Sequence, residues 1–593
     1  MNDSGNAASG ISSGGNGRRR LLLALLLVAG AAALLVNLLL SKAAPGPREI
    51  PPVLQPVAER DAERGAESRT PVADWAIEGV ESAPEPSASA GGAAAVGVPG
   101  FLRGGTEPSA YTPVSRESLA ERIPALLAAP NLRKCVVALA VFSVSDGGMV
   151  YERSADRPLI VASNAKLFTS GAALALLGPD YRFETRLYAD GEIEEGGHLH
   201  GDLIVVGAGD PDVTGDGRAN QDQLLPRLVE AVRNSGLRRI AGRLVIDDHV
   251  FDRQYVPSTW RRTELTSPYN APASGFSLFE NCVSILVRPG EVVGDPARAA
   301  LVGQPGVFKI VCKAKTVTGT NVQISAAGPR ADEPLDPGPV TVRGNMPMGV
   351  NLYRLVTPVR EPPLVAGMLL RQALVSAGIV VEGDVVLAEQ STQERLAGRS
   401  PLATVSSSLQ DAMMKMNKES SNVVAEHVYK LCGWAETGQG SYASGSKAVL
   451  SVLGRLGIET MGASSADGSG ISRQNRYTAR QVAQFLAALY RSSLRDHFVH
   501  TLPESGVDGT LKNRLQEPEI KGRVRAKTGY VSAVSSLSGY CQTRQGEILS
   551  FSMLFNGYSG RNQYVKPIQD SIARLLIDLE APSREPEGSG RND

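Results

Sequence analysis

A chain of 593 residues is too long for one hydrophobic core, because single cores stop growing near ~250–300 residues. Lys plus Arg and Asp plus Glu both total 61, so the formal net charge is zero. The longest basic run is Arg18-Arg19-Arg20, which argues against nucleic acid as a partner. The five cysteines are widely spaced and form no zinc-binding pattern, so most are expected to be buried thiols.

The N-terminal part predicts export. Residues 21–40 are apolar apart from Asn37, and a helix of that length spans ~30 Å, the hydrocarbon thickness of a bilayer. The arginines before it should stay in the cytoplasm with the disordered tail 1–17. A cleaved signal peptide is the alternative, because Ser41-Lys42-Ala43 is a small-x-small site. Residues 18–42 are therefore expected to be a transmembrane anchor or a signal peptide, with the bulk of the chain extracytoplasmic.

Residues 43–112 are rich in Pro, Ala, Glu, Gly and Ser, which predicts a disordered linker. Ser115 is a candidate N-cap of an amphipathic helix that carries Leu119 and Ile123. Residues 136–143 predict an apolar strand, and Asp146-Gly147-Gly148 turns the chain into a second strand.

A helix of small residues is expected to begin at Ser163 and to end before Gly178-Pro179. From Ser163 to Ser420 there are 257 residues, more than one helical subdomain needs. We expect residues 191–394 to form an inserted, β-rich region. Its predicted strands are 203–206, 243–247, 283–288, 308–312, 320–325 and 340–342.

Helical character returns after about residue 395, and strands are expected at 523–527, 535–541 and 548–555, before a final helix near 563–579. Residues 113–190 and 395–580 would then form one split α/β domain. The remaining residues, 581–593, read as a disordered tail.

Three short motifs occur in one order: Ser163-Asn164-Ala165-Lys166, Ser420-Ser421-Asn422 and Lys527-Thr528-Gly529. Ser-x-x-Lys, Ser-x-Asn and Lys-Thr-Gly are the elements of the serine β-lactamase and penicillin-binding site. Lys-Thr-Gly occurs once, against roughly 0.06 copies expected by chance. A second Ser-x-x-Lys, Ser444 to Lys447, follows Ser-x-Asn and is in the wrong order.

These residue types suit acyl transfer without a histidine. The Ser163 hydroxyl needs a base, and Lys166 serves only when neutral, although the ordinary lysine pKa is ~10.4. Desolvation and nearby cations lower such a pKa, and we expect Lys418 and Lys527 to converge on Lys166. Ser420 would relay a proton between Lys418 and the leaving amine. Asn422 would hold Lys166 or the substrate amide.

The Lys527-Thr528-Gly529 strand supplies a cation and a hydroxyl suited to a terminal carboxylate. Gly529 would let the substrate backbone lie against the strand edge. The backbone N–H groups of Ser163 and Tyr530 are expected to hold the oxyanion.

With these motifs, the chain resembles the class C low-molecular-mass penicillin-binding proteins, the DacB type of D-alanyl-D-alanine carboxypeptidase/endopeptidase. The resemblance implies a five-stranded antiparallel sheet flanked by helices and interrupted by two inserted domains. It implies cleavage of D-Ala-D-Ala or of the cross-bridge through an acyl-enzyme on Ser163, which β-lactams trap. It is carried by Ala162–Thr169, Gly201–Leu203, Gly209–Pro211, Met416–Asn422, Asp467–Gly470, Ser472–Arg476 and Gly522–Gly529.

Two positions depart from the family pattern. Ser421 stands where the family usually has Asp, and its side chain is expected to point away from the pocket. Tyr530-Val531 replaces a common Thr-Leu, which bears on substrate preference. In some members an acidic residue of the insertion reaches the substrate's side-chain amine, and Glu264 is the candidate here.

The interpretation is a serine-type D-Ala-D-Ala carboxypeptidase/endopeptidase, anchored on the periplasmic side of a bacterial inner membrane and acting on peptidoglycan stem peptides. A β-lactamase or esterase on the same fold and a non-catalytic wall-binding scaffold are the alternatives. No cofactor or metal is expected, because His198-Leu199-His200 reads as alternation on a surface strand.

Overall fold

The computed structural model describes residues 111–213, 223–302, 308–327 and 339–580. The expected anchor or signal peptide, the linker up to residue 110 and the C-terminal tail lie outside these residues. Within the described ranges, no helix is long and apolar enough to cross a membrane.

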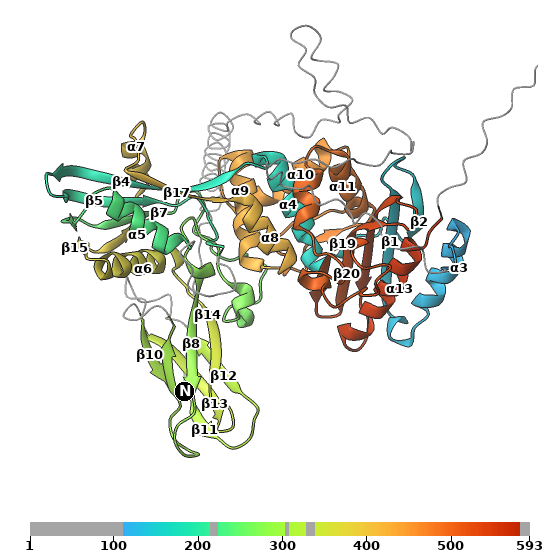
Figure 1. Ribbon diagram of the computed structural model, residues 1–593, viewed down its shortest axis with the longest axis horizontal. Coiled ribbons are helices and arrows are strands. Elements are labelled where there is room, and N and C mark those ends of the chain that lie inside the picture. Colours follow the sequence, from blue (N-terminus) through green and yellow to red (C-terminus); the bar gives the residue numbers. More distant parts are fainter. Residues whose placement is uncertain (1–110, 214–222, 303–307, 328–338, 581–593) are drawn as a thin grey trace, which may run out of the picture. The chain divides into compact units, whose positions relative to one another are not determined.

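One five-stranded antiparallel sheet joins the two ends of the chain, in the order β19-β20-β21-β1-β2. Strand β1 pairs with β21 along its whole length, from Val136 opposite Asn556 to Ser143 opposite Leu549. In Figure 1 the strands from the blue end of the colour scale lie beside those from the red end. This sheet confirms the expected split domain fold. Its strands are β1 (Val136–Ser143), β2 (Met149–Arg153), β19 (Val524–Val531), β20 (Val534–Gln542) and β21 (Ile548–Asn556).

Helices bury both faces of this sheet. On β1, Leu139 and Val141 pack into a core with helices α3 (Arg116–Leu127) and α13 (Lys566–Ile577). The alternate residues Ala138 and Ala140 pack with the helices of the other face, because successive side chains of a strand point in opposite directions. Those helices are α4 (Ala165–Leu177), α8 (Leu409–Lys418), α9 (Asn422–Thr437), α10 (Tyr442–Arg455), α11 (Ala479–Arg491) and α12 (Arg495–Thr501).

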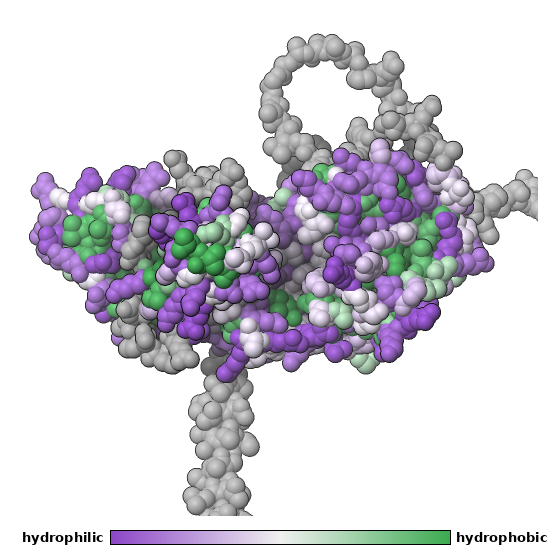
Figure 2. Space-filling view, turned by 90° about the horizontal axis from the view of Figure 1, so that it is seen from below, coloured by the Kyte–Doolittle hydropathy of each residue, from purple (hydrophilic) through white to green (hydrophobic). Residues whose placement is uncertain are grey.

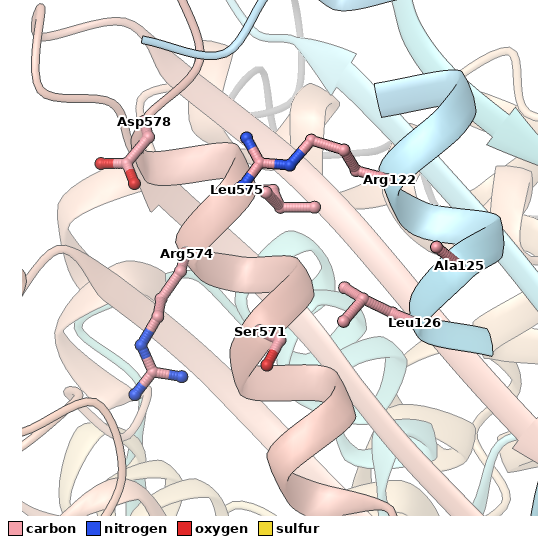
Figure 3. A pocket seen from close by; sticks show the side chains of 7 residues that line it. All are labelled: Arg122, Ala125, Leu126, Ser571, Arg574, Leu575 and Asp578. Carbon is pink, nitrogen blue, oxygen red and sulfur yellow. The ribbon is translucent and has the colours of Figure 1, made fainter. Parts of the chain in front are cut away.

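A groove of about 570 Å³ lies between α3 and α13 (Figure 3). Arg122 and Leu126 of α3 face Leu575 and Asp578 of the C-terminal end across it. Asp578 is already paired with Arg544 at 2.6 Å. None of the residues that line this groove belongs to the three motifs, so it is separate from the site described below.

The first part of the β-rich insertion is a seven-stranded mixed sheet, which also carries helices that the sequence did not predict. Strand β5 runs parallel to β6 and β7, and parallel neighbours need crossover connections, which α5 (Leu224–Asn234) and α6 (Pro362–Ser376) supply. A short helix, α7 (Gln390–Leu396), follows. The strands are β4 (Arg182–Glu194), β5 (His198–Val206), β6 (Arg239–Ile240), β7 (Leu244–Asp247), β15 (Val380–Val381), β16 (Val385–Leu387) and β17 (Ala403–Ser408).

The second part of the insertion consists of two small sheets. One has the order β14-β8-β9, and in the other β13 is flanked by β10 and β11 and also pairs with β12. Because β4 begins at Arg182 and β17 ends at Ser408, the inserted strands extend beyond the 191–394 boundaries inferred from sequence. The strands of this part are β8 (Cys282–Arg288), β9 (Arg298–Leu301), β10 (Lys309–Cys312), β11 (Lys315–Val317), β12 (Gln323–Ala327), β13 (Pro339–Pro347) and β14 (Tyr353–Pro358).

Candidate active site

Ser163 lies on a tight turn before α4. The short strand β3 (Leu159–Ile160), paired with β18 (Arg476–Tyr477), leads into a single 3₁₀ turn over Ala162–Asn164. Ala162 has a φ of 47°, a left-handed conformation that is strained for a residue with a Cβ. The α-helix therefore begins at Ala165, two residues later than expected, and the half-buried Ser163 precedes it.

Lys166 is buried one turn further on, and its contacts within the described part of the chain are neutral oxygens. Its Nζ lies 3.2 Å from Ser163 Oγ, 2.7 Å from Asn422 Oδ1 and 2.8 Å from the carbonyl of Ser469. Burial lowers the pKa of Lys166 to about 7, although the carboxylates of Glu426 and Asp467 act in the opposite direction. A neutral amine has two N–H donors and one lone pair. The amide and the carbonyl can take the donors, which leaves the lone pair for the proton of Ser163.

The Ser-x-Asn motif forms the connection between α8 and α9. Ser420 has a φ of 63°, and this left-handed turn redirects the chain after α8. Ser421 caps α9 by accepting from Val424 N at 3.5 Å, and its hydroxyl donates to Glu280 rather than to the nucleophile. Asn422 is the first residue of α9; its amide nitrogen donates to the carbonyl of Tyr269 at 3.0 Å, while its oxygen accepts from Lys166.

Lys527 provides the second buried cation of the site. Its Nζ donates to Ser420 Oγ at 2.9 Å and to the carbonyl of Thr528 at 3.0 Å. Burial, and after it the charge of Lys166, lowers the pKa of Lys527 well below its usual value. The structure therefore brings Ser163, Lys166 and Asn422 into one set of contacts and Ser420 and Lys527 into a second, and the charge of Lys166 acts on Lys527.

Lys418 does not occupy the position expected for it. It is the last residue of α8, and its ammonium pairs with Asp508. Among the described residues, the cation that contacts Ser420 is Lys527. The expectation of a relay from Lys418 through Ser420 is therefore corrected: the left-handed turn at Ser420 separates the two side chains, and Lys527 takes the place beside the hydroxyl.

Strand β19 lies at the edge of the sheet, and part of that edge is open. Ala526 N donates to Pro503 O at 3.0 Å, on the side of β19 that faces away from β20. Residues two and four positions further along, Thr528 and Tyr530, direct their backbone groups to the same side, because the strand has a period of two. The N–H of Tyr530 is thus directed to the open edge, as expected for an oxyanion donor, and its side chain is 59% exposed.

A loop beside β19 contributes one more hydroxyl. Thr510 Oγ1 lies 2.8 Å from Thr528 Oγ1, and both residues lie at the surface of the site. Asp508 of the same loop binds Lys418 and accepts from Glu504 N at 2.9 Å. Sequence reasoning did not single out Thr510, since no motif spacing connects it to Lys527-Thr528-Gly529.

Two glycines let backbone segments close on the nucleophile. A Cβ on Gly470, which has a φ of 86°, would meet the carbonyl oxygen of Ala162 at 1.9 Å. A Cβ on Gly529 would meet Ser536 Oγ at 2.2 Å and Ser163 N at 3.0 Å. The strand β19 and the 467–470 segment can therefore approach the Ser163 turn only because these two positions lack side chains.

Two buried carboxyl groups lie behind Lys166. Glu426 accepts from the N–H of Ser469 at 2.9 Å, and the carbonyl of Ser469 binds Lys166. Burial and the charge of Asp467 raise the pKa of Glu426 to about 8. Asp467 accepts from Trp260 Nε1 at 2.8 Å, so a residue of the insertion contributes to the support of the lysine.

Asn164 is a structural member of the first motif that sequence reasoning did not assign. Its amide nitrogen donates to the carbonyl of Lys527 at 2.7 Å, and its oxygen accepts from Ser538 at 2.8 Å. This buried amide connects the Ser163 turn to β19 and β20. In the sequence, the only signal for this role is that a polar amide side chain stands directly after Ser163 within the Ser-x-x-Lys motif.

Glu264 lies on a short 3₁₀ turn, Arg262–Glu264, with half of its side chain exposed, and pairs with Arg261 at 3.6 Å. Tyr269, five residues on, touches Asn422 through its carbonyl, so the 262–270 segment borders the site. His198 and His200 are exposed on β5 and face Glu194. Ser444 is buried within α10 and hydrogen-bonds Ser441, as expected of a structural serine.

The fold and the site define a class of protein: a split helix–sheet–helix domain in which a buried lysine lies 3.2 Å from a serine hydroxyl, the arrangement of the Ser-x-x-Lys element. Residues 119–579 match the model of the D-Ala-D-Ala carboxypeptidase 3 (S13) family. The chain belongs to this family.

Two relatives support the assignment. The chain is 32% identical to a D-alanyl-D-alanine carboxypeptidase of Actinomadura sp. (strain R39), over 79% of this chain and 86% of that protein. It is 30% identical to D-alanyl-D-alanine carboxypeptidase DacB of Haemophilus influenzae, over 68% and 81%. The crystal structure of penicillin binding protein 4 (dacB) from Haemophilus influenzae matches the fold with a TM-score of 0.67 and 24% identity, covering 77% of this chain and 99% of that one.

Proposed function

We propose that this protein is a serine-type D-alanyl-D-alanine carboxypeptidase/endopeptidase that acts on peptidoglycan stem peptides through an acyl-enzyme on Ser163. The observation that carries the proposal is the position of Lys166 Nζ, 3.2 Å from Ser163 Oγ and bound otherwise only to Asn422 and Ser469. An amine with a pKa of about 7 in this position can accept the proton of the hydroxyl at neutral pH.

In acylation, Ser163 Oγ attacks the carbonyl carbon of the penultimate D-Ala, and its proton passes to Lys166. The oxyanion is held by the N–H groups of Ser163 and Tyr530. The amine of the terminal D-Ala leaves after the proton taken up by Lys166 reaches it through Ser420, whose hydroxyl Lys527 holds at 2.9 Å, and Lys166 is then neutral again. Water then attacks the ester, with Lys166 again as the base, and releases the shortened peptide.

The terminal carboxylate of the substrate would meet the Lys527 ammonium and the hydroxyls of Thr528 and Thr510. A charge-assisted hydrogen bond of this kind is stronger than a neutral one. Substrate backbone would pair with the open part of β19. Glu264, on the segment that borders the site, is proposed to face the amine of the stem-peptide side chain. A β-lactam would be bound and opened by the same groups, leaving the ester on Ser163.

Covalent labelling with a fluorescent penicillin tests the proposal. The parent chain should be labelled in a single covalent step, and Ser163→Ala should abolish labelling. Ser444→Ala is the matched control, because it removes the serine of the other Ser-x-x-Lys and should leave labelling intact. Labelling that survives Ser163→Ala would reject Ser163 as the nucleophile.

Digestion of purified muropeptides assigns the reaction. Loss of one D-Ala from a pentapeptide demonstrates the carboxypeptidase, and separation of cross-linked dimers demonstrates the endopeptidase. Rapid penicillin turnover without D-Ala release would instead indicate a β-lactamase. Retained peptidoglycan binding without acylation or hydrolysis would indicate a scaffold protein.

We also propose that the enzyme works on the extracytoplasmic side of a bacterial inner membrane, held by residues 18–42 or exported by them. The support is the apolar run 21–40 with the preceding arginines. Mass measurement of the mature N-terminus separates the two: a start near residue 43 indicates cleavage, and retention of residues 1–42 indicates the anchor. The inserted region is proposed as one domain, with its boundaries moved from 191–394 to about 182–408 by the strands β4 and β17, and the flanking parts of 113–580 as the other.

A further inference from the structure

The two small sheets of the insertion end in three loops that lie together. Gly294 N, in the loop after β8, donates to the carbonyl of Thr316 in β11 at 2.9 Å. Met348 N, in the loop after β13, donates to the carbonyl of Val317 at 2.9 Å. Strand β14 begins beside the end of β8, with Tyr353 opposite Val287. We call the end formed by residues 289–294, 318–321 and 348–352 the tip.

The tip exposes four large apolar side chains. Val292 is 58% exposed, Val293 51%, Met348 38% and Leu352 44%. Scattered apolar residues are normal on a protein surface, but a group gathered at one end of a small unit marks an interaction site. Figure 2 views the molecule from below, so that this end faces the viewer, and shows green residues there within a purple surround.

The exposure of the two valines is built into the loop. Asp295 Oδ2 accepts from the N–H groups of Glu291 and Val292, each at 3.1 Å. The N–H of Gly290 donates to Thr316 Oγ1 at 2.7 Å. These bonds hold the loop in a fixed turn, so the valines cannot fold back onto the core without breaking them.

Basic side chains surround the tip. Lys315 and Arg343 are exposed on the outer face of the β10-β13-β11 sheet, where they alternate with buried residues such as Thr316 and Val342. Arg288 is exposed at the end of β8, and Lys309 and Lys313 lie further along the same sheet as Lys315. No described carboxylate forms an ion pair with any of these five. By contrast, both described acids of the unit are engaged, Glu291 with Arg298 at 2.9 Å and Asp295 within its loop.

The sequence shows the same bias. Residues 282–358 contain eight Lys and Arg and five Asp and Glu, a net charge of +3 in a chain whose total is zero. Three of those five acids, Asp332, Glu333 and Asp336, lie outside the described residues. The rest of the chain is therefore net acidic, and positive charge is concentrated on the unit that carries the apolar tip.

We propose that the tip docks on an anionic lipid surface, with Val292, Val293, Met348 and Leu352 entering the headgroup region and Arg288, Lys315 and Arg343 meeting the lipid phosphates. Burial of apolar side chains together with basic residues is what drives proteins onto anionic bilayers. Each basic residue near such a surface contributes about 1 kcal/mol, or about fivefold in partition coefficient. A second copy of the chain fits less well, because it would bring an equally basic tip against this one.

The test places a tryptophan at the tip of the full-length protein. Val292→Trp is mixed with vesicles that contain phosphatidylglycerol with brominated acyl chains, and its emission is compared with that of the parent. Met461→Trp is the matched control: Met461 is 75% exposed, follows α10 in the peptidase domain, and would be brought to the vesicle by the same N-terminal segment.

The tip tryptophan should be quenched and shifted to shorter wavelength on anionic vesicles, whereas the control should not change. Adding Arg288→Glu and Lys315→Glu should reverse the effect, as should ~1 M salt, which shortens the Debye length to ~3 Å. An unchanged emission of Val292→Trp would overturn the proposal. Equal quenching on uncharged phosphatidylcholine vesicles would also overturn it, and so would a shift that depends on protein concentration without vesicles, which would identify a second copy as the occupant. Penicillin labelling of the same samples reports folding and activity independently of the tip.

Discussion

Two lysines are buried in the same pair of packed helices, and the main difference between their surroundings is a carboxylate. Lys166 on α4 contacts a hydroxyl, an amide oxygen and a carbonyl. Lys430 on α9 contacts two carbonyls and, at 2.6 Å, the carboxylate of Asp252. It also lies over the rings of Phe251 and Tyr442.

Burial lowers the pKa of both lysines, but at Lys430 the charge of Asp252 opposes the shift directly. The contact of Lys430 with Asp252 joins α9 to the insertion. Lys166 has no carboxylate in contact and can lose its proton. Burial is common to both lysines, so the main difference between the structural Lys430 and the proposed base Lys166 is a carboxylate in contact.

The largest expected effect comes from removing each lysine in turn. Lys166→Met should reduce the second-order rate of acylation by penicillin about 10²–10⁴-fold, the contribution usual for a general base. Lys430→Met, the matched change, should leave the rate within about twofold, because Lys430 does not touch the reacting groups. Stopped-flow labelling measures both rates. Equal losses in the two variants would show that burial of a lysine in these helices, and not its contact with Ser163, determines activity.

The pH dependence of acylation sharpens the comparison. The active form of Lys166 is neutral, so its fraction grows as pH rises toward the pKa of about 7. The rate should increase about tenfold per pH unit below that value and level off above it. Lys430→Met should show the same profile. An inflection near the ordinary lysine value, or a rate that falls through neutrality, would contradict the assignment.

Lys430 should matter for the stability of the fold, although it does not matter for the reaction. Lys430→Met removes the donor from the carbonyls of Asp252 and Gln254 and should lower the free energy of unfolding by about 1–3 kcal/mol. Urea denaturation measures the loss. Lys447→Met, at an exposed position of α10, is the control and should change stability by less than about 0.5 kcal/mol. A loss at Lys430 no larger than at Lys447 would show that the buried cation stabilises nothing.

Glu426 acts electrostatically on both lysines, and its substitution gives the smallest predicted effect. It lies one turn after Asn422 and one turn before Lys430 on the same face of α9, and its negative charge raises the pKa of both lysines. Because the pKa of Glu426 is raised to about 8, only a minor fraction of its carboxyl is ionised where Lys166 titrates. Glu426→Gln removes that fraction of negative charge, so the inflection of the acylation profile should move to lower pH by less than about half a unit. A move to higher pH would contradict the electrostatic role. The level of the plateau should stay within about threefold of the parent.

The residues proposed to react are easier to predict from the sequence than the residues that hold them in place. Ser163, Lys166 and Lys527 are recognisable because each belongs to a motif with fixed spacing. Lys418 was misassigned because nearness in sequence to Ser420 does not survive the left-handed turn between them. Glu426 and Asp467 carry no motif, and only the folded chain brings them together behind the base.

The fold shows the same division. The strand at residues 136–143 and the N-cap at Ser115 are local patterns, and the structure has both. The parallel pairing of β5 with β7 is not local, since alternation within a strand says nothing of its neighbour. The two crossover helices of the insertion were missed for this reason, and so was the strand β4 that begins at Arg182.

The partly covered edge of β19 has a consequence for substrate length. Beyond Lys527, toward the beginning of the strand, the edge is occupied by Pro503 and Ser505, which bind Ala526 and Val524. A peptide laid along Thr528 and Tyr530 would meet Pro503 and Ser505 just past the ammonium, because the strand edge is already occupied there. An occupied edge leaves room for the free end of a peptide and less for a chain that continues. We therefore expect release of terminal D-Ala to be faster than cleavage of cross-links.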